Sequence, residues 1–443
     1  MPLGWRRGSR KARHDGKNHT GNSDMELVIP NHFRCPISLD LMKDPVTLSS
    51  GITYDRESIE TWLETGKFTC PVTNQMLNSF DRIPNHALTK MIQDWCVEKE
   101  KYGVQRIPTP RIPVAPVEVS EILSGVSESA RRLDQYRCLE LVQKIQKWGA
   151  ESERNRRCIV ANGAAAVLAA AFDAFANESI ERNATVLEDI LSALNWMFPV
   201  DTEAQKSLGS RASLGCMVWF LSCRDISSKK NSLSALKELL ACDQQLVEKV
   251  SSIEGVNEIL IELVRKQICP TITKASIMVI FYLVSSSSPS SEKIKSTFVK
   301  MGLVSLMLEI LVDSEKSIGE RALGVFDGIC CCKEGIEEAQ SNALTIPVLV
   351  KKILRLSDLA TEYSISAILK LCKYGRHEAE RVLLVEALQV GAFQKLLLVI
   401  QVGCGDETKE KATELMKLLN PYRVAGTFEC IETTDFKNLK RSF

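Results

Sequence analysis

Two four-residue motifs, Cys35-Pro36-Ile37-Ser38 and Cys70-Pro71-Val72-Thr73, are the parts of this chain best suited to metal chemistry. A structural zinc ion takes four Cys or His ligands, commonly as Cys-x-x-Cys pairs. Here a hydroxyl residue replaces the second cysteine of each pair, and no two of the 15 cysteines have that spacing. Because replacing a thiolate ligand removes zinc affinity, the sequence predicts two zinc-knuckle-like loops that hold no metal. We expect no cofactor.

The elements that must position these loops can be read from the residues between them. Residues 45–48 and 52–54 are rich in β-branched and aromatic side chains and flank Ser49-Ser50-Gly51, which predicts a hairpin. Asp55 stands where a helix N-cap is favoured, and Gly66 is suited to end that helix. A helix between them buries one apolar stripe, formed by Ile59, Trp62 and Leu63.

A second helix is predicted after Asn85, with an apolar stripe formed by Leu88, Met91, Ile92 and Trp95. A domain of about 70 residues buries little surface, so hydrogen bonds and ion pairs must hold its loops if no metal does. The candidates for these contacts are Ser38, Asp40, Asp44, Asp55, Arg56, Glu57 and Thr73.

The composition is that of a water-soluble protein. The 443 residues are 45% hydrophobic and 25% charged, with a net charge of +1, so neither a nucleic-acid partner nor membrane insertion is expected. The longest apolar runs fall well short of the ~20 residues that span a bilayer. The odd cysteine count and the lack of a signal-peptide pattern indicate a reducing compartment. We expect a cytoplasmic protein, with the nucleus as a second location.

Residues 1–27 are expected to form a disordered basic tail, because six of the first 20 are Lys or Arg and almost nothing there can be buried. A solvated extension is the simpler interpretation, and a nuclear-localisation or nucleic-acid role is the alternative. Met25 is an alternative start. Residues 28–102 form the small domain. Residues 103–118 contain four prolines and are expected to be an extended linker, with a peptide motif as the alternative.

Residues 119–424 are helical throughout, and short junctions recur every 41 to 48 residues. The junctions are Asn162-Gly163, Leu208-Gly209, Glu254-Gly255, Met301-Gly302, Asn342-Ala343 and Val390-Gly391. This period predicts an armadillo- or HEAT-like α-solenoid of about six repeats, which buries a continuous core by stacking and offers a concave face to a protein partner. Residues 425–443 are a C-terminal tail. The chain is therefore mainly α, with a small α+β domain at its start.

Three features of the solenoid have two interpretations each. Asn195-Trp196 could lie on the concave face or pack in the core. The serine-rich run 285–291 is a loop, either plain or phosphorylated. Cys330-Cys331-Cys332 is interpreted as core or boundary packing, with a reactive cluster as the alternative, because consecutive helical residues point in different directions.

The segments Pro30–Val46 and Gly51–Ile59 resemble a U-box, the metal-free relative of the RING finger. With the helical repeats, the whole chain resembles the plant U-box and armadillo-repeat ubiquitin ligases. The resemblance implies that the chain binds a ubiquitin-conjugating enzyme charged with ubiquitin and promotes transfer to a substrate lysine. It implies no covalent intermediate on the ligase, and therefore no catalytic residue.

By resemblance, the surface that binds the conjugating enzyme is formed by Ile37 and Leu39 in the first loop, Trp62 in the helix and Pro71 in the second loop. Core packing is the alternative for each, above all for Trp62, which also fits the buried stripe. Many active relatives carry Arg or Lys after the second loop, where this chain has Asn74. An amide can donate a hydrogen bond, but it has no charge and a shorter reach.

The partners implied are the charged conjugating enzyme, a protein substrate held in the armadillo groove and, as an open alternative, a second copy bound through the U-box. Two rival functions remain at this point. One is a non-catalytic armadillo adaptor whose U-box only docks, which Asn74 favours. The other is a nuclear scaffold that uses the basic tail on nucleic acid.

Overall fold

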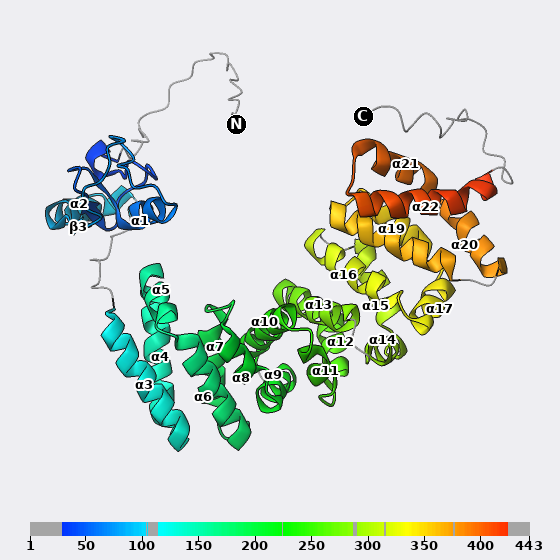
Figure 1. Ribbon diagram of the computed structural model, residues 1–443, viewed down its shortest axis with the longest axis horizontal. Helices are drawn as coiled ribbons and strands as arrows, with labels where there is room; N and C mark the ends of the chain where they lie inside the picture. The colour runs from blue at the N-terminus through cyan, green and yellow to red at the C-terminus, as the bar shows by residue number, and fades with distance from the viewer. Residues whose placement is uncertain are drawn as a thin grey trace, which may run out of the picture. The chain divides into compact units, whose positions relative to one another are not determined.

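The computed structural model describes residues 29–102, 104, 114–223, 225–286, 290–313, 316–374 and 377–423. The chain divides between Pro113 and Val114 into two compact units, drawn in Figure 1. The expected basic tail, most of the proline-rich segment and the C-terminal tail lie outside the described residues. The first unit holds both cysteine motifs, and the second holds the helical repeats.

The first unit is built around an antiparallel sheet of three short strands in the order β2-β1-β3. Strands β1 (Pro45–Thr47) and β2 (Thr53–Asp55) form the predicted hairpin, with Val46 opposite Tyr54. Strand β3 (Ile83–Pro84) pairs with the other edge of β1 and was not predicted. With only two residues, it has no periodic pattern of its own.

The described residues of this unit also contain four helical segments: the 3-10 turn η1 (Asn31–Phe33), α1 (Arg56–Glu64), α2 (His86–Glu98) and the 3-10 turn η2 (Glu100–Tyr102). Both predicted helices are confirmed. Asn85 caps α2, because its side chain accepts the Leu88 N–H at 3.0 Å.

Two details of these helices correct the sequence interpretation. Asp55 precedes α1 as expected, but its side chain does not cap that helix. Its Oδ1 instead accepts the backbone N–H groups of Lys43 at 2.7 Å and Asp44 at 2.9 Å. In α2, Met91 is 52% exposed, whereas Ile92 and Cys96 are buried. The stripe that faces the sheet has i, i+4 spacing, so it bypasses Met91.

The second unit begins with a helix pair, α3 (Pro116–Arg132) and α4 (Gln135–Glu151). Helix α3 starts three residues inside the segment expected to be linker. Proline fits the first turn of a helix, where no intrahelical bond needs its N–H. The Glu118 side chain then accepts the Ala115 N–H at 2.9 Å.

Six repeats of three helices follow within the described residues, in the order short first helix, second helix, third helix. The first three repeats are α5 (Glu153–Ala161), α6 (Ala164–Glu178), α7 (Ala184–Asn195); α8 (Thr202–Leu208), α9 (Arg211–Cys223), α10 (Ile226–Cys242); and α11 (Leu246–Ser251), α12 (Val256–Lys266), α13 (Pro270–Ser285). The last three are α14 (Ser291–Lys300), α15 (Leu303–Asp313), α16 (Lys316–Ile329); α17 (Lys333–Ser341), α18 (Thr345–Lys352), α19 (Asp358–Lys373); and α20 (His377–Gln389), α21 (Ala392–Val402), α22 (Asp406–Arg423). Three helices per repeat define the armadillo arrangement, rather than the paired helices of HEAT repeats.

The predicted junctions connect the first and second helices of each repeat. At four of them a glycine adopts a left-handed conformation, with φ of 77° at Gly163, 78° at Gly255, 80° at Gly302 and 85° at Gly391. Only glycine reaches this region without steric cost. The repeat signal in the sequence is therefore a recurring tight turn.

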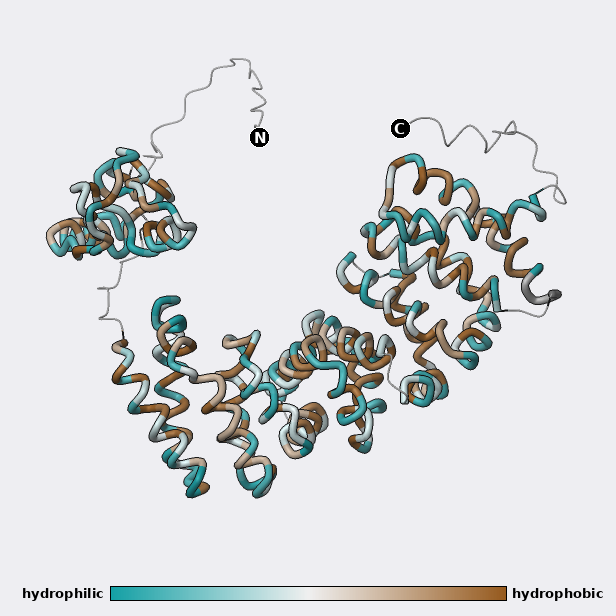
Figure 2. Tube along the Cα trace, in the orientation of Figure 1, coloured by the Kyte–Doolittle hydropathy of each residue, from teal (hydrophilic) through white to brown (hydrophobic). Residues whose placement is uncertain are grey.

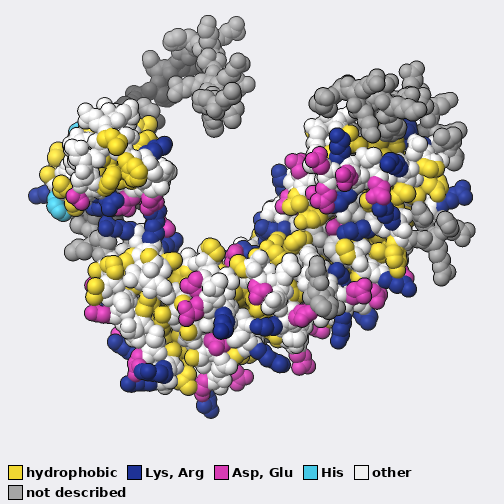
Figure 3. Space-filling model, in the orientation of Figure 1, with side chains coloured by type: hydrophobic (Ala, Val, Ile, Leu, Met, Phe, Trp, Pro, Cys, Tyr) yellow, Lys and Arg dark blue, Asp and Glu magenta, His cyan; other side chains and the backbone are white. Residues whose placement is uncertain are grey.

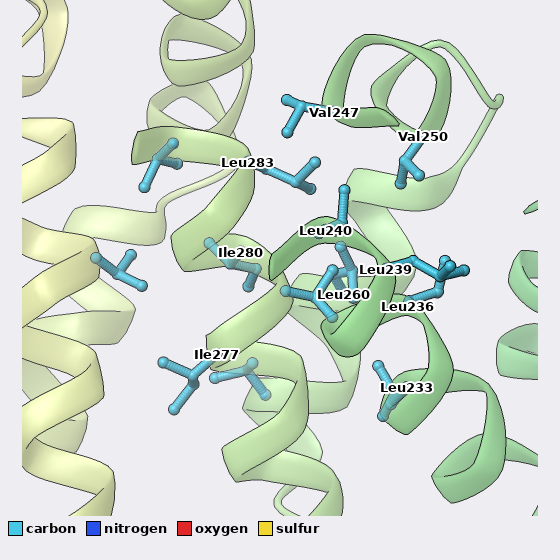
Figure 4. Packing of buried hydrophobic residues seen from close by; sticks show 14 of the residues in the cluster. Leu233, Leu236, Leu239, Leu240, Val247, Val250, Leu260, Ile277, Ile280 and Leu283 are labelled. Atoms are coloured by element: carbon cyan, nitrogen blue, oxygen red, sulfur yellow. The ribbon is translucent and has the colours of Figure 1, made fainter. Parts of the chain in front are cut away.

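Stacking of the third helices builds the core of the second unit. Helices α7, α10, α13, α16, α19 and α22 pack against one another in succession and lie on the inner side of the curved stack (Figure 1). Hydrophobic segments in Figure 2 lie along the helix faces that meet neighbouring helices. Figure 4 shows Leu236, Leu239 and Leu240 of α10 beside Leu260, Ile277 and Ile280 of the next repeat. Each repeat thus buries its apolar face against its neighbours.

In the part of the chain that the structure describes, no single helix is both long enough and apolar enough to cross a membrane. Two sharply bent helix pairs, Glu153–Ala161 with Ala164–Glu178 and Arg381–Gln389 with Ala392–Val402, meet that test by length and composition alone.

Candidate functional site

The two cysteine motifs form loops with the same backbone hydrogen bonds. In the first loop, residues 35–40, Cys35 N–H donates to the Asp40 carbonyl and Leu39 N–H to the Cys35 carbonyl, each at 2.8 Å. In the second loop, residues 70–75, Cys70 N–H donates to the Gln75 carbonyl and Asn74 N–H to the Cys70 carbonyl, also at 2.8 Å. The fifth residue of each loop has a positive φ, 63° at Leu39 and 56° at Asn74. The loops are therefore two copies of one turn.

In the first loop the sulfur of Cys35 is a hydrogen-bond acceptor at the centre of the turn. Its Sγ accepts the Asp55 N–H at 3.3 Å. Burial raises the pKa of this thiol, but hydrogen bonds from the backbones of Ser38, Asp55 and Ile37 and from the Ser58 hydroxyl outweigh burial and lower it. Protein N–H groups thus surround the sulfur where a metal ion would otherwise neutralise it.

The second loop uses its sulfur in the same way with different donors. The Tyr54 hydroxyl lies 3.0 Å from Cys70 Sγ and accepts the Val72 N–H at 3.3 Å. Burial raises the pKa of Cys70, but the hydroxyls of Ser50, Thr73 and Tyr54 and the Thr73 backbone lower it to about 6. Burial also raises the pKa of the Tyr54 phenol, so its hydroxyl keeps a proton that it can donate to the Cys70 sulfur.

Strand β2 and the start of α1 hold both loops. Two consecutive residues form hydrogen bonds with the two sulfurs: the Asp55 N–H with Cys35 Sγ and the Tyr54 hydroxyl with Cys70 Sγ. The next residue, Arg56, donates from Nε to Asp44 Oδ2 at 2.6 Å, and its N–H donates to the Asp44 carbonyl at 2.9 Å. Polar contacts at Asp44, Asp55, Arg56, Ser38 and Thr73 match the expectation that hydrogen bonds and ion pairs hold these loops.

The five side chains expected to bind the conjugating enzyme come from these loops and from α1. Ile37 and Pro71 are half-buried, Leu39 is 67% exposed, and Asn74 is exposed. Trp62 is half-buried, because its Nε1 donates to the Thr69 carbonyl at 2.9 Å and Lys67 lies over its ring at 4.2 Å. Trp62 thus links α1 to the second loop, while both loop tips remain accessible.

Sequence reasoning missed further apolar side chains around the second loop. Val72 and Phe68 are each 52% exposed, Met76 is 74% exposed, and the rings of Phe68 and Phe80 lie 5.3 Å apart. Figure 3 shows hydrophobic side chains gathered on the visible face of this unit. The available signal was large apolar residues inside a predicted loop, where no helical or strand period gives them a core position.

The chemistry that this surface supports is docking. Among the described residues, no group of three or more His, Cys, Asp or Glu side chains is arranged to hold a metal ion. Cys35, Cys70 and Cys96 are each 0% exposed, so none of these thiols can meet a bound thioester. The loops present a mixed surface to solvent, in which Leu39 and Val72 are exposed beside polar residues such as Ser38 and Asn74.

In the solenoid, Asn195 and Trp196 serve contacts between and within repeats. Asn195 Nδ2 donates to the Asn231 carbonyl of the next repeat at 3.2 Å. Trp196 is half-buried against Gly149, with the Arg156 guanidinium 5.6 Å from its ring centroid. These contacts favour the packing interpretation.

The other two ambiguous features of the solenoid fall at helix ends. Cys330 and Cys332 are buried and Cys331 is exposed, which fits packing at the end of α16. The serine run connects α13 to α14 as a loop, and its residues 287–289 lie outside the described residues.

Comparisons with known proteins agree with this architecture. The family model of the U-box domain matches residues 29–101, and the model of the plant U-box protein ARM repeat region matches residues 118–441. U-box domain-containing protein 21 of Arabidopsis thaliana is 46% identical over 421 residues, covering 95% of this chain and 94% of that protein. E3 ubiquitin-protein ligase PUB22 of the same plant is 35% identical over 427 residues, covering 89% and 95%.

Among solved structures, computationally designed armadillo repeat proteins for modular peptide recognition are 17% identical, with a TM-score of 0.48 over 56% of this chain and 100% of that chain.

The fold and the paired loops define a RING-like domain joined to an armadillo solenoid. The chain belongs to the plant U-box proteins with ARM repeats. This is a family of E3 ubiquitin ligases.

Proposed function

We propose that the two loops bind a ubiquitin-conjugating enzyme charged with ubiquitin, and that the solenoid brings a protein substrate to it. The observation that carries this proposal is the pair of identically folded loops that expose apolar side chains on one small domain. Ile37, Leu39, Trp62 and Pro71 form the apolar contact, and Asn74 donates a hydrogen bond at its rim. A small apolar patch with a polar edge is typical of a transient docking surface.

The reaction proceeds by direct transfer of ubiquitin from the conjugating enzyme to a substrate lysine. We propose no covalent intermediate on the ligase, and the burial of the three U-box thiols supports this. Its contribution is to hold the charged enzyme, restrict the motion of the thioester and raise the local concentration of the lysine. Asn74, being uncharged, restrains the ubiquitin less strongly than an arginine would.

The setting is the reducing cytoplasm, which keeps the two buried sulfurs as free acceptors for the loop N–H and hydroxyl groups. Hydrogen bonds to the two sulfurs hold the loops in place of a metal ion or a disulfide.

The test is discharge of ubiquitin from charged conjugating enzymes to free lysine, run over a broad panel of such enzymes with the full chain. We expect stimulation with at least one enzyme, and the same rate when a zinc chelator is present. If the chain binds conjugating enzymes but stimulates none, it is an adaptor whose U-box only docks, and the proposal of ligase activity fails.

A further inference from the structure

A cavity of about 390 Å³ opens among the third helices of three consecutive repeats. Phe281 of α13, Gly324 and Gly328 of α16, and Tyr363 of α19 line one side of it. The rings of Phe281 and Tyr363 lie 6.2 Å apart, edge to face. Since these helices form the inner side of the solenoid, the cavity belongs to the face that a partner would occupy.

The two glycines make this apolar side. A Cβ atom at Gly324 would stand 3.0 Å from the Phe281 ring and 3.1 Å from the Tyr363 ring, and one at Gly328 would stand 3.0 Å from Val284. Glycine inside a helix is less favourable than alanine. The two glycines, one turn apart on one face of α16, let both rings approach the helix backbone closely.

The other side of the cavity is polar and includes a hydroxyl without a partner. Ser291, the first residue of α14, is only 6% exposed, and its Oγ has no hydrogen-bond partner among the described residues. Lys295 lies one turn later on the same face of α14, and within the described part of the chain no carboxylate lies within ion-pair distance of it. A buried hydroxyl left unpaired is unfavourable unless a ligand satisfies it.

The charge on this side selects the ligand. Asp327 also lines the cavity, but Lys370 Nζ neutralises it with hydrogen bonds to its Oδ1 at 2.7 Å and to its carbonyl at 3.0 Å. Lys295 therefore leaves a net charge of about +1, and the N-terminus of α14 adds partial positive charge. Glu292, in the first turn of α14, would repel a ligand that carries two negative charges. The balance favours one carboxylate over a phosphate dianion.

We propose that this cavity binds an acidic side chain of a substrate protein, flanked by an aromatic or aliphatic residue. The carboxylate binds Lys295 and the Ser291 hydroxyl, and the apolar neighbour lies against the partly exposed rings of Phe281 and Tyr363. The inference rests on the proposed function, because it names the chemistry by which the solenoid selects its substrate.

The experiment is fluorescence anisotropy with the full chain and fluorescein-labelled hexapeptides whose central residues are Phe-Glu-Phe. Matched peptides carry Gln, Lys or phosphoserine in place of the Glu. We expect the Glu peptide to bind about tenfold more tightly than the Gln peptide, as for loss of one partly buried charge contact. Equal affinity of the Glu and Gln peptides, or tighter binding of the phosphoserine peptide, would overturn the assignment.

Two variants separate recognition from folding. Lys295→Glu should bind the Lys peptide in preference to the Glu peptide, whereas Lys293→Glu, the same change on an exposed face of α14, should keep the wild-type order. Ser291→Ala should weaken the Glu peptide several-fold without lowering the melting temperature, because its hydroxyl has no partner in the free protein. A lower melting temperature with unchanged affinity would make Ser291 a structural residue and refute the site.

Ubiquitin discharge to free lysine by the wild-type chain is measured in parallel, because it needs no substrate protein. Loss of peptide selectivity with normal discharge refutes the cavity alone. Failure of discharge with selective peptide binding refutes the proposed ligase activity alone.

Discussion

The two loops of the U-box, residues 35–40 and 70–75, follow one backbone course but differ in what holds them and in what they present. The first is held by backbone N–H groups around Cys35, and the second mainly by the side-chain hydroxyls around Cys70. At the matching left-handed position the first carries an exposed leucine and the second an asparagine.

Each loop has two parts with different roles. The frame is the turn of backbone around the central sulfur, and the tip is the residue with positive φ, Leu39 or Asn74. A central sulfur that accepts several hydrogen bonds fixes the frame, whichever groups donate them. The tip is free to vary. Leu39 has a positive φ, which is unfavourable for a branched side chain, and its side chain is exposed to water. Neither feature stabilises the fold. The proposed docking role would account for an exposed leucine at this position.

The largest effect on the frames is expected from Asp55→Ala. The Asp55 carboxylate accepts two backbone N–H groups from the segment that follows the first loop, and each such bond to a charged group contributes about 1.5–3 kcal/mol. The variant should destabilise the U-box by about 3 kcal/mol, seen as faster hydrogen exchange at Lys43 and Asp44. Asp55→Asn, which retains an acceptor oxygen, should lose less than half of that. Equal losses of stability in the two variants would show that the acceptor oxygen of residue 55 does not stabilise the U-box.

Next in size is Tyr54→Phe, which acts on the second loop alone. It removes the hydroxyl shared by Cys70 Sγ and the Val72 N–H, and we expect a loss of about 1–3 kcal/mol. Exchange should accelerate across residues 70–75 and stay unchanged across residues 35–40. Tyr136→Phe, at an exposed solenoid tyrosine, is the matched control. Equal acceleration in both loops would mean that the loops are not held independently.

A third test uses pH, because the pKa of Cys70 is about 6 in the folded chain against 9.0 for an ordinary cysteine. Below pH 6 both states hold the proton, and the thiol contributes nothing to the pH dependence. Between pH 6 and 9 the unfolded chain binds more protons, so stability should rise with pH and then level off. Protection of residues 70–75, corrected for intrinsic exchange rates, should follow this curve, and Cys70→Ser should flatten it. A flat wild-type curve would contradict the assignment.

The smallest effects come from exchanging the tip residues. Asparagine tolerates the left-handed region better than leucine does. Leu39→Asn should therefore stabilise the U-box by about 0.5–1 kcal/mol, and Asn74→Leu should destabilise it by a similar amount, both measured by chemical denaturation. Leu39→Asn should at the same time slow ubiquitin discharge. A variant that gained stability and kept full activity would remove the functional explanation for Leu39.

Much of this structure could be predicted from residues that lie close together in the sequence. The hairpin, the cap at Asn85 and the repeat junctions depend on residues close in sequence, such as the glycines at positions 163, 255, 302 and 391. The cysteine motifs likewise marked both loops. Resemblance, rather than residue chemistry, supplied the docking residues.

Other features depend on contacts between distant segments and could not be foreseen. Strand β3 exists only because Ile83 and Pro84 reach the edge of β1. From the sequence, the Asp55 carboxylate was expected to cap α1. Only the fold shows that it instead accepts the backbone N–H groups of Lys43 and Asp44. The equivalence of Leu39 and Asn74 needed backbone angles. The cavity at Ser291 needed three repeats packed together.

The most direct test of the central claim, that hydrogen-bonded loops without a metal present the docking surface, is ubiquitin discharge to free lysine by the wild-type chain and Ile37→Ala, each with and without a zinc chelator. Ile83→Ala, an exposed isoleucine of the same domain on β3, is the control. We predict chelator-resistant discharge that Ile37→Ala reduces at least about tenfold, as expected for a residue that dominates a small interface, while Ile83→Ala retains it. Discharge that the chelator abolishes, or that Ile37→Ala leaves intact, would contradict the account.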